Sequence, residues 1–435
     1  MKKLFLLTLC ALALFSCNKG GAPEDELADY TVIVYSHLGL DTDYEIEEVW
    51  EELKTQLPDK KIRVLALHKY GVEIKNFSGK NGAPGEVLCF ELDKDTDFTK
   101  LHSDQSAGKS YKLYDPENIK AVLNKARKEL PAREYVLAFF GHGGGFMPRE
   151  DYPKDILTKA ILSDDGVNGL SVSIFEIAEA IKESNIPHLK AILFNNCLMG
   201  GMESLMEVAP YSDYFIATPF LLTSENNPLI PVLVKNLHDC SSFEAAAQKT
   251  ITDSEERLYD GHRKEGVPFN GNIELVKSAG LEDVCAAAKE LATRLCELYP
   301  TRKEAIDKAS LAVYQFYYDK PFYDFMDYAS NLAQETGDAK FAAVKSQLEA
   351  AFKKTILKQL TIDLKELPLL PSFSLSVTLC HHQKYQESFH SVSNKYSFTY
   401  QDSYERTAFH KKTGWGKWLD TNTCILHGNP CGQAQ

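Results

Sequence analysis

The sequence has no cluster of positive charge and only one long apolar stretch, and these absences exclude whole classes of function. Its 48 Lys and Arg residues are outnumbered by 61 Asp and Glu residues, so the net charge is −13, and no basic run offers a track for phosphates. We therefore expect no nucleic-acid partner. Beyond the first 16 residues, no apolar segment is long enough to span a bilayer. The 44% of hydrophobic residues indicates a globular chain rather than a disordered one.

Several catalytic and metal-binding signatures are also missing. There is no His-Glu-x-x-His motif, which excludes a zinc peptidase of that type, and no Gly-x-Ser-x-Gly motif of a serine esterase. The ten cysteines include no Cys-x-x-Cys pair and are too few for a disulfide scaffold. Cys424, His427 and Cys431 lie close together in the sequence but lack a second ligand pair. A local Cys424–Cys431 disulfide, or no bond at all, is therefore favoured over zinc.

The amino-terminal segment has the pattern of an export signal. Two lysines precede an apolar segment at residues 4–15 that is too short to cross a bilayer, and Ser and Cys17 follow it. This ending resembles a bacterial lipobox, in which cleavage leaves a cysteine that takes lipid on its thiol. We predict a signal peptide at 1–16, a lipidated Cys17 and an acidic tether at 17–28. The exported protein would then be anchored in the cell envelope, with the outer membrane favoured. An ordinary signal peptide that happens to end in Cys is the alternative.

The first half of the chain alternates between strand and helix patterns. Near-continuous apolar runs predict strands at residues 30–35, 61–67, 85–91, 135–140, 189–194 and 214–217. Amphipathic patterns predict helices at residues 44–57, 116–130 and 173–184. This alternation predicts an α/β fold with a largely parallel central sheet and helices on both faces.

The pattern changes after residue 241, where long helices replace the alternation. We predict an α/β core at 29–241 and a second region at 242–435, packed on the core, that is helical at first and then returns to strands. The clearest helices of this second region are expected at residues 281–299 and 340–357, and its strands at 372–379 and 396–400.

Two predicted strands end in residues that suit nucleophilic catalysis. Phe-Phe-Gly-His-Gly-Gly-Gly at 139–145 places His142 after one strand, and Phe-Asn-Asn-Cys-Leu-Met-Gly at 194–200 places Cys197 after another. Ligands of open α/β sheets bind outside the carboxyl ends of the strands, so neighbouring strands would bring the two side chains together. The glycines would let a substrate backbone approach and leave N–H groups free to meet a developing oxyanion.

Each of these residues also has a plainer interpretation. A lone Cys after an apolar strand is usually part of the core, and a His in a Gly-rich turn is usually structural. His142 and the glycines after it resemble the oxyanion segment of esterases as well. The Gly141-x-Gly143 pattern is not a nucleotide-binding loop, because no Gly-Lys-Ser/Thr follows it and Pro148 would break the helix. The pairing of His142 with Cys197 at two Gly-flanked strand ends favours catalysis.

These segments resemble the clostripain family of cysteine peptidases, which shares a clan with caspases and gingipains. The matching segments are residues 131–146 and 194–203, with weaker agreement at 30–35, 315–332 and 413–418. The spacing of 55 residues from His142 to Cys197 is close to that of caspases. The resemblance implies a caspase-like fold, Cys197 as nucleophile and His142 as acid/base. It also implies an oxyanion site formed by the backbone N–H groups of Gly143 and Cys197.

The chain departs from the family pattern where the resemblance implies substrate contacts. Asn195 stands where the family has an Asp that binds Arg or Lys side chains of the substrate, and an amide loses that charge. A second pocket residue of the family, a Glu after the strand at 214–217, is missing, and Glu225 is the nearest candidate to replace it. Phe146 replaces a Trp. Catalysis is thus better supported than a preference for basic residues.

The sequence therefore predicts a lipid-anchored, monomeric cysteine endopeptidase that acts on proteins or peptides and needs no cofactor, although a calcium requirement stays open. Family members often cut themselves between the His and Cys segments, where Lys154 and the Lys159–Ala160 bond lie. The alternative interpretation is that these lysines are ordinary surface residues and are not cut. Two alternatives remain: a catalytically weak or inactive binding module with the same fold, and an enzyme that uses the same dyad on a non-peptide acyl group.

Overall fold

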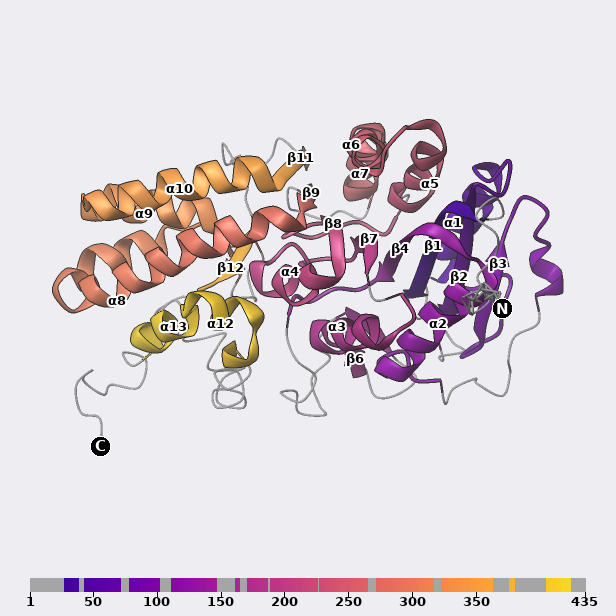
Figure 1. Cartoon of the computed structure of the whole chain (residues 1–435), viewed down its shortest axis with the longest axis horizontal. Helices are drawn as coiled ribbons and strands as arrows, with labels where there is room; N and C mark the ends of the chain where they lie inside the picture. The colour runs from indigo at the N-terminus through magenta and orange to yellow at the C-terminus, as the bar shows by residue number, and fades with distance from the viewer. Residues whose placement is uncertain are drawn as a thin grey trace, which may run out of the picture.

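The computed structural model describes residues 27–38, 43–71, 78–101, 111–146, 161–164, 170–186, 188–225, 227–264, 271–316, 322–362, 375–379 and 404–423 (Figure 1). An eight-stranded sheet in the order β11-β9-β8-β7-β4-β1-β2-β3 forms its centre. The strands of this sheet are β1 (Ala28–His37), β2 (Ile62–Lys69), β3 (Val87–Leu92), β4 (Ala132–Gly141), β7 (Leu189–Asn195), β8 (Ser212–Ala217), β9 (Gly271–Lys277) and β11 (Ile356–Ile362).

The middle of this sheet is parallel. Strands β2, β1, β4, β7 and β8 run in one direction, whereas β3 at one edge and β9 and β11 at the other are antiparallel to their neighbours. The parallel strands are almost entirely buried, which explains why their sequences are near-continuous apolar runs. The predicted α/β fold with a mostly parallel sheet between helices is confirmed.

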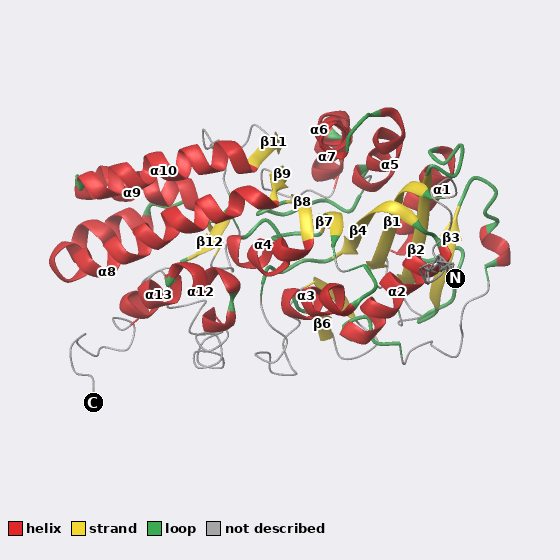
Figure 2. Cartoon of the chain, in the orientation of Figure 1, coloured by secondary structure: helices red, strands yellow, loops and turns green. Residues whose placement is uncertain are grey.

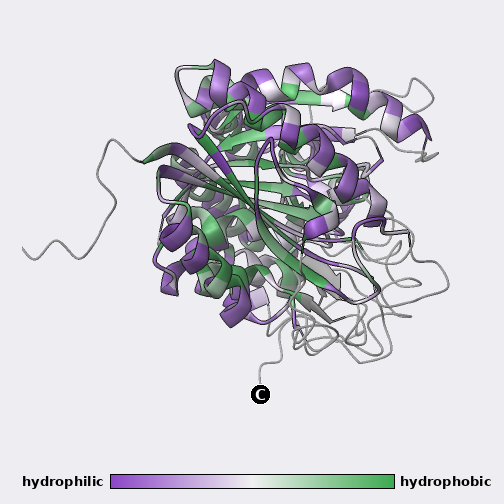
Figure 3. Cartoon of the chain, turned by 90° about the vertical axis from the view of Figure 1, so that its right-hand side faces the viewer, coloured by the Kyte–Doolittle hydropathy of each residue, from purple (hydrophilic) through white to green (hydrophobic). Residues whose placement is uncertain are grey.

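Helices cover both faces of the sheet (Figure 2). One face packs against α1 (Asp43–Thr55), α5 (Leu229–Asp239), α6 (Phe243–Asp253) and α7 (Glu255–Lys264), and the other against α2 (Pro116–Glu129), α3 (Ile174–Glu183) and α4 (Met202–Val208). In Figure 3 the apolar strands lie between these helices, whose outer surfaces are more polar. Three of these helices begin at capping residues: Asp115 caps α2, Ser173 forms a capping box at α3, and Ser242 caps α6.

A helical layer lies beyond the β9 and β11 edge of the sheet (Figure 1). In it, α8 (Leu281–Leu311), α9 (Phe325–Thr336) and α10 (Ala339–Thr355) pack against one another, and α12 (Ala408–Thr413) and α13 (Trp415–Thr423) pack on α8. Two small antiparallel pairs complete the described structure: β5 (Ile161–Asp164) with β6 (Leu170–Val172), and β10 (Phe322–Asp324) with β12 (Ser376–Thr378).

The second half of the chain differs from the prediction in two strands. β9 was not predicted, since only helices were expected between residues 242 and 360, and β11 begins at Ile356, inside the final turn of a predicted helix. Both strands extend the central sheet. β9 alternates apolar residues with Asn272 and Glu274, so it lacks the continuous apolar run that marks the parallel strands. The predicted strand at 372–379 is confirmed in part by β12, and the one at 396–400 lies outside the described residues.

The predicted export signal at 1–16, Cys17 and nearly all of the predicted tether lie outside the described residues. Among the helices that the structure describes, none combines the length and the apolar character needed to span a bilayer. In the same residues, no three His, Cys, Asp or Glu side chains gather in a way that would hold a metal ion.

Candidate active site

Strands β4 and β7 bring His142 and Cys197 to the same edge of the sheet. The two strands are parallel neighbours, and Phe140 pairs with Asn195 in their register. His142 and Cys197 each lie two residues further along the chain, so both follow the carboxyl ends of adjacent strands. This is the arrangement expected from the two motifs.

The backbones of the two segments are in direct contact at Gly143. A Cβ atom at this position would lie 2.1 Å from the carbonyl oxygen and 2.8 Å from the nitrogen of Cys197. No side chain fits in that space, so glycine is required here because the loop that follows β4 touches the nucleophile's own peptide group. The two proposed oxyanion donors, Gly143 and Cys197, are therefore next to each other.

Asn196 ties the two segments together through its side chain. Its Nδ2 donates to the carbonyl oxygens of Gly141 at 2.9 Å and of His142 at 3.0 Å, and the residue is almost completely buried. One amide group thus joins the residue that precedes Cys197 to the residue that bears the imidazole. The sequence analysis did not single out Asn196, because no motif predicts where its amide points.

The turn after the nucleophile has an unusual backbone. Leu198 has a φ of 62°, in the left-handed region that non-glycine residues occupy only at a cost of about 1–3 kcal/mol. Two hydrogen bonds hold this turn against the segment after β8: the Leu198 N–H donates to the Phe220 carbonyl at 2.8 Å, and the Gly200 N–H to the Thr218 carbonyl at 2.7 Å. The strained turn fixes the direction in which Cys197 leaves its strand.

The thiol of Cys197 is half-buried and contacts the same segment. The Leu222 N–H donates to Sγ at 3.4 Å, and Sγ lies 3.5 Å from the Leu222 carbonyl oxygen, to which it donates. Leu222 therefore presents both of its backbone polar groups to the Cys197 thiol.

Asn195, two residues before Cys197, is buried, with 5% of its surface exposed. Its Oδ1 accepts a hydrogen bond of 2.8 Å from Asn227 Nδ2, which also donates to the Thr223 carbonyl at 2.7 Å. The Asn227 Oδ1 accepts from the Leu229 N–H at 3.1 Å. Asn227 was not found by sequence reasoning, because it lies 32 residues from its partner and outside every motif.

Glu225 lies two residues before Asn227 in the chain, and its carboxylate contacts side chains of other elements. Oε2 accepts a hydrogen bond of 3.0 Å from the Tyr44 hydroxyl, and Oε1 lies 3.7 Å from Nζ of Lys264. About 30% of the side chain is exposed. The charge of Glu225 is thus shared with a lysine of α7 in this structure.

Phe146, which replaces the family's Trp, is a core residue. It is 1% exposed, and its ring makes edge-to-face contacts with Phe322 at 6.2 Å and Tyr404 at 5.6 Å between ring centroids. The replacement therefore affects the packing of the loop after β4 against β10 and the segment before α12.

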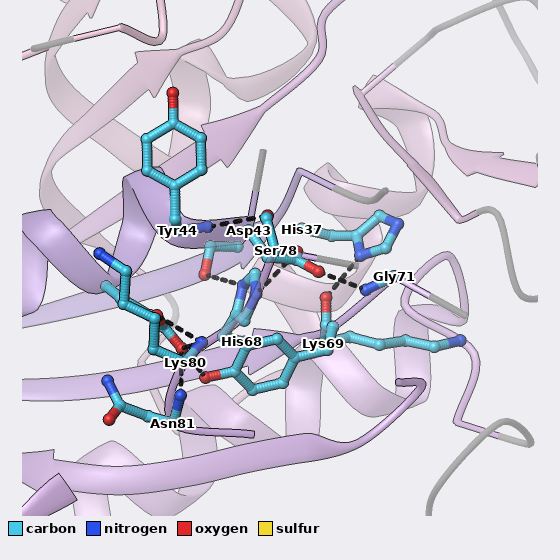
Figure 4. Close-up of polar contacts among 12 residues, drawn as sticks. His37, Asp43, Tyr44, His68, Lys69, Gly71, Ser78, Lys80 and Asn81 are labelled. Atoms are coloured by element: carbon cyan, nitrogen blue, oxygen red, sulfur yellow. Dashed lines mark hydrogen bonds and ion pairs between the residues drawn. The ribbon is translucent and has the colours of Figure 1, made fainter. Parts of the chain in front are cut away.

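The neighbouring strand ends hold a second set of polar residues (Figure 4). Ser36 Oγ lies 3.0 Å from Nδ1 of His68, and His68 Nε2 lies 3.2 Å from Oδ1 of Asp43. This Ser-His-Asp composition suggests a catalytic triad, but all three residues are completely buried, and the Ser36 hydroxyl also donates to the Leu67 carbonyl. Asp43 accepts from the Gly71 N–H as well, so the set fixes the start of α1 rather than binding a substrate.

The remaining cysteines of the described residues contribute nothing to this site, and several predicted site residues are not described. Cys89, Cys240, Cys285 and Cys296 form no disulfide among the described residues, and burial raises the pKa of Cys285 to about 12. Lys154, Lys159, Ala160, Cys424, His427 and Cys431 lie outside the described residues.

Cys197 and His142 follow adjacent parallel strands, and a thiol and an imidazole are the pair of side chains that cysteine hydrolases use. The model of the clostripain family matches residues 83–421, most of the chain. The protein belongs to the clostripain family.

The solved structures that resemble the chain are C11 cysteine proteases. An inactive zymogen from Parabacteroides distasonis has a TM-score of 0.59 at 17% sequence identity, covering 89% of this chain and 98% of its own. Iotapain, a secreted C11 protease from Bacteroides thetaiotaomicron, has a TM-score of 0.60 at 15% identity, covering 89% and 99%. A complex of a secreted C11 protease from the same organism with an irreversible peptide inhibitor gives 0.59 at 16%, covering 90% and 100%. At these identities the likeness shows a shared fold. No curated protein matches the chain significantly in sequence.

Proposed function

We propose that the protein is a cysteine endopeptidase that hydrolyses peptide bonds through Cys197 and His142. The observation that supports this most strongly is the contact between the two strand-end segments, where Asn196 and Gly143 join the loop of the imidazole to the backbone of the nucleophile. A thiolate is a strong nucleophile, and a protonated imidazole nearby favours the thiolate form.

The reaction follows from this arrangement in two halves. The Cys197 thiolate attacks the scissile carbonyl, while the backbone N–H groups of Gly143 and Cys197 stabilise the oxyanion. The tetrahedral species collapses as His142 donates its proton to the leaving amine, which leaves an acyl-enzyme. His142 then takes a proton from water, the hydroxide adds to the acyl carbon, and the thiolate leaves.

The proposed substrates are proteins or peptides. The peptide inhibitor bound to the structural neighbour from Bacteroides thetaiotaomicron supports this class. Asn195 replaces the carboxylate that binds basic side chains in relatives, and Glu225 already shares its charge with Lys264. We expect Arg and Lys at the cleavage position to have no advantage over neutral side chains, since a buried guanidinium without a counter-charge is costly to desolvate.

An inactive binding module is the second candidate, and the contact of Leu222 with the Cys197 thiol favours it. The description of one structural neighbour as an inactive zymogen is consistent with a closed form of this kind. The two functions differ in a simple way: a closed enzyme gains activity when Leu222 is displaced, whereas a binding module never cleaves.

We further propose that the protein acts as a monomer, anchored in the cell envelope through a lipid on Cys17. The dyad itself requires no metal ion. Fractionation of cells that express the wild type or Cys17→Ala tests the anchor. We expect the wild type in the membrane fraction and the variant outside it.

Peptide cleavage by the purified mature chain tests the proposed function. The account expects the wild type to hydrolyse members of a peptide library, and expects Cys197→Ala and His142→Ala each to lose several orders of magnitude in rate. Cleavage that persists in Cys197→Ala would overturn the mechanism, and its complete absence in every form would favour the binding module.

A further inference from the structure

We propose that the site selects a substrate side chain that ends in a hydrogen-bond acceptor, a carboxamide or a carboxylate, through the Nδ2 group of Asn195. This inference rests on the proposed peptidase function and adds the class of side chain at the cleavage position. It follows from the orientation of one buried amide and from the groups that surround it.

The orientation of Asn227 is fixed by backbone groups on both sides. The Leu229 N–H can only donate, so the atom of Asn227 that it meets is Oδ1. The Thr223 carbonyl can only accept, so the atom that it meets is Nδ2. The same Nδ2 then donates its second hydrogen to the side chain of Asn195.

Asn195 must therefore use its oxygen toward Asn227, which leaves its own Nδ2 on the other side of the amide. This Nδ2 is fully buried and has no hydrogen-bond acceptor among the residues that the structure describes. A buried donor without an acceptor destabilises the fold, and a ligand with a suitable acceptor would remove that cost. The amide thus presents an unsatisfied donor.

The position of this donor relates it to the nucleophile. Asn195 lies two residues before Cys197, and its partner Asn227 is bound to Thr223, the residue after Leu222. Leu222 in turn contacts the Cys197 thiol. A substrate that displaces Leu222 from the thiol enters beside Thr223 and Asn227, where it meets the amide of Asn195.

The charges around the site support an acceptor rather than a cation. The nearby carboxylate of Glu225 is bound by the Tyr44 hydroxyl and shares its charge with Lys264. An Arg or Lys side chain would place more N–H donors against the Nδ2 donor. A Gln or Glu side chain would offer an oxygen instead, and a Leu side chain would leave the donor unsatisfied.

The charge at position 195 can be inverted with almost no change in shape. In Asn195→Asp, one carboxylate oxygen would still accept from Asn227, and the other would replace the Nδ2 donor with an anionic acceptor. Asn227→Asp leaves Asn195 itself intact but changes which atom of its amide faces the substrate, because the new carboxylate cannot donate to Asn195 Oδ1. The amide of Asn195 would then turn its Nδ2 toward the new carboxylate at position 227 and present its oxygen to the substrate.

The decisive measurement compares peptides that differ only in Gln, Glu, Leu or Arg at the cleavage position. In the wild type, kcat/KM for the Gln or Glu peptide should exceed that for the Leu peptide by about tenfold, and Arg should rank last. Asn195→Asp should raise Arg above Gln, and Asn227→Asp should remove the advantage of Gln. A wild-type preference for Arg, or a Gln-to-Leu ratio that neither variant changes, would overturn the inference.

Binding of the same peptides to Cys197→Ala separates this inference from the proposed function. Affinity by calorimetry should follow the order of the acceptor side chains even without turnover, and should reverse when Asn195→Asp is added. An acceptor preference in binding without any cleavage by the wild type would refute the peptidase and uphold the selection. Cleavage by the wild type, together with equal affinity for the Gln, Leu and Arg peptides, would uphold the peptidase and refute the selection.

Discussion

At the scale of single residues, Asn196 joins the segment that bears His142 to the segment that bears Cys197. Its amide donates to the carbonyls of Gly141 and His142, so the imidazole segment is held by the residue next to the nucleophile. Small displacements matter at such sites, since a shift of about 1 Å can reduce the rate by about 100-fold. Asn196 is accordingly a positioning residue.

Replacing Asn196 with Ser should therefore lower kcat far more than it changes KM. We expect a loss on the order of 10- to 100-fold in kcat, together with a changed pH dependence of Cys197 alkylation by iodoacetamide, because the imidazole no longer holds its place beside the thiol. Kinetics and an alkylation profile check this prediction.

Asn236→Ser provides a matched control for that variant. Asn236 is also fully buried, and its amide donates to Thr250 and Asp253 between α5 and α6, away from the dyad. The Asn236→Ser variant should lose stability, with no change in the alkylation profile of Cys197. Equal changes in both variants would show that Asn196 acts only through folding.

The sequence predicted that His142 and Cys197 lie at neighbouring strand ends, but it did not predict the residues that surround them. His142 and Cys197 each follow a long apolar run, so the end of the strand and the chemistry of the side chain were visible together. Leu222 and Asn227 come from the segment after β8 and reach the site only through the fold. The hydrogen-bond network that fixes the amide of Asn195 depends on their positions, and no local pattern encodes it.

At the scale of secondary-structure elements, β9 inserts a buried acid into the sheet. Glu274 pairs in register with Ala217 at the end of β8, and its Oε1 accepts from Asn272 and from Gln359 of β11. Burial, with a smaller contribution from the charge of Asp324, raises the pKa of Glu274 from 4.5 to about 8. The carboxyl group is therefore protonated in the fold at neutral pH.

This pKa predicts that stability falls with rising pH. Between pH 4.5 and 8 the unfolded chain has released the proton of Glu274 while the fold retains it, so unfolding becomes easier as pH rises through this range and levels off above it. The contribution is about 3–5 kcal/mol. The difference in unfolding free energy between Glu274→Gln and the wild type, measured by urea at several pH values, should grow in favour of the variant.

A constant difference across this pH range would show that Glu274 is ionised in the fold.

The elements that the sequence predicted well are those with one simple physical signature. The parallel strands are buried on both faces and read as apolar runs, and α2 and α3 begin at capping residues. The direction of β3, which is antiparallel to β2, has no such signature in its sequence. β9 was missed because it places Asn272 and Glu274, which hydrogen-bond each other, in the core, where polar residues are not expected from sequence alone.

At the scale of the whole molecule, the chain joins a mostly parallel sheet, with His142 and Cys197 at one edge, to a helical layer. The connection from β4 to β7 includes Lys159 and Ala160, which lie outside the described residues. We predict that the enzyme cuts the bond between them, as its relatives often do between the His and Cys segments. Intact-mass analysis and amino-terminal sequencing should find a new terminus at Ala160 in the wild type and not in Cys197→Ala. A fully active chain that stays uncut would contradict this prediction.

Covalent labelling tests the central claim, that Cys197 attacks a peptide carbonyl with the help of His142. The mature protein is incubated with a peptidyl chloromethyl ketone, which places an electrophile where the scissile carbonyl would lie, and the adduct is mapped by mass spectrometry. We predict one adduct, on Cys197, whose rate of formation falls strongly in His142→Ala, while Cys285 stays unmodified because burial raises its thiol pKa to about 12. Labelling spread over the other thiols, or labelling of Cys197 at the same rate with a non-peptide chloromethyl ketone, would contradict the account.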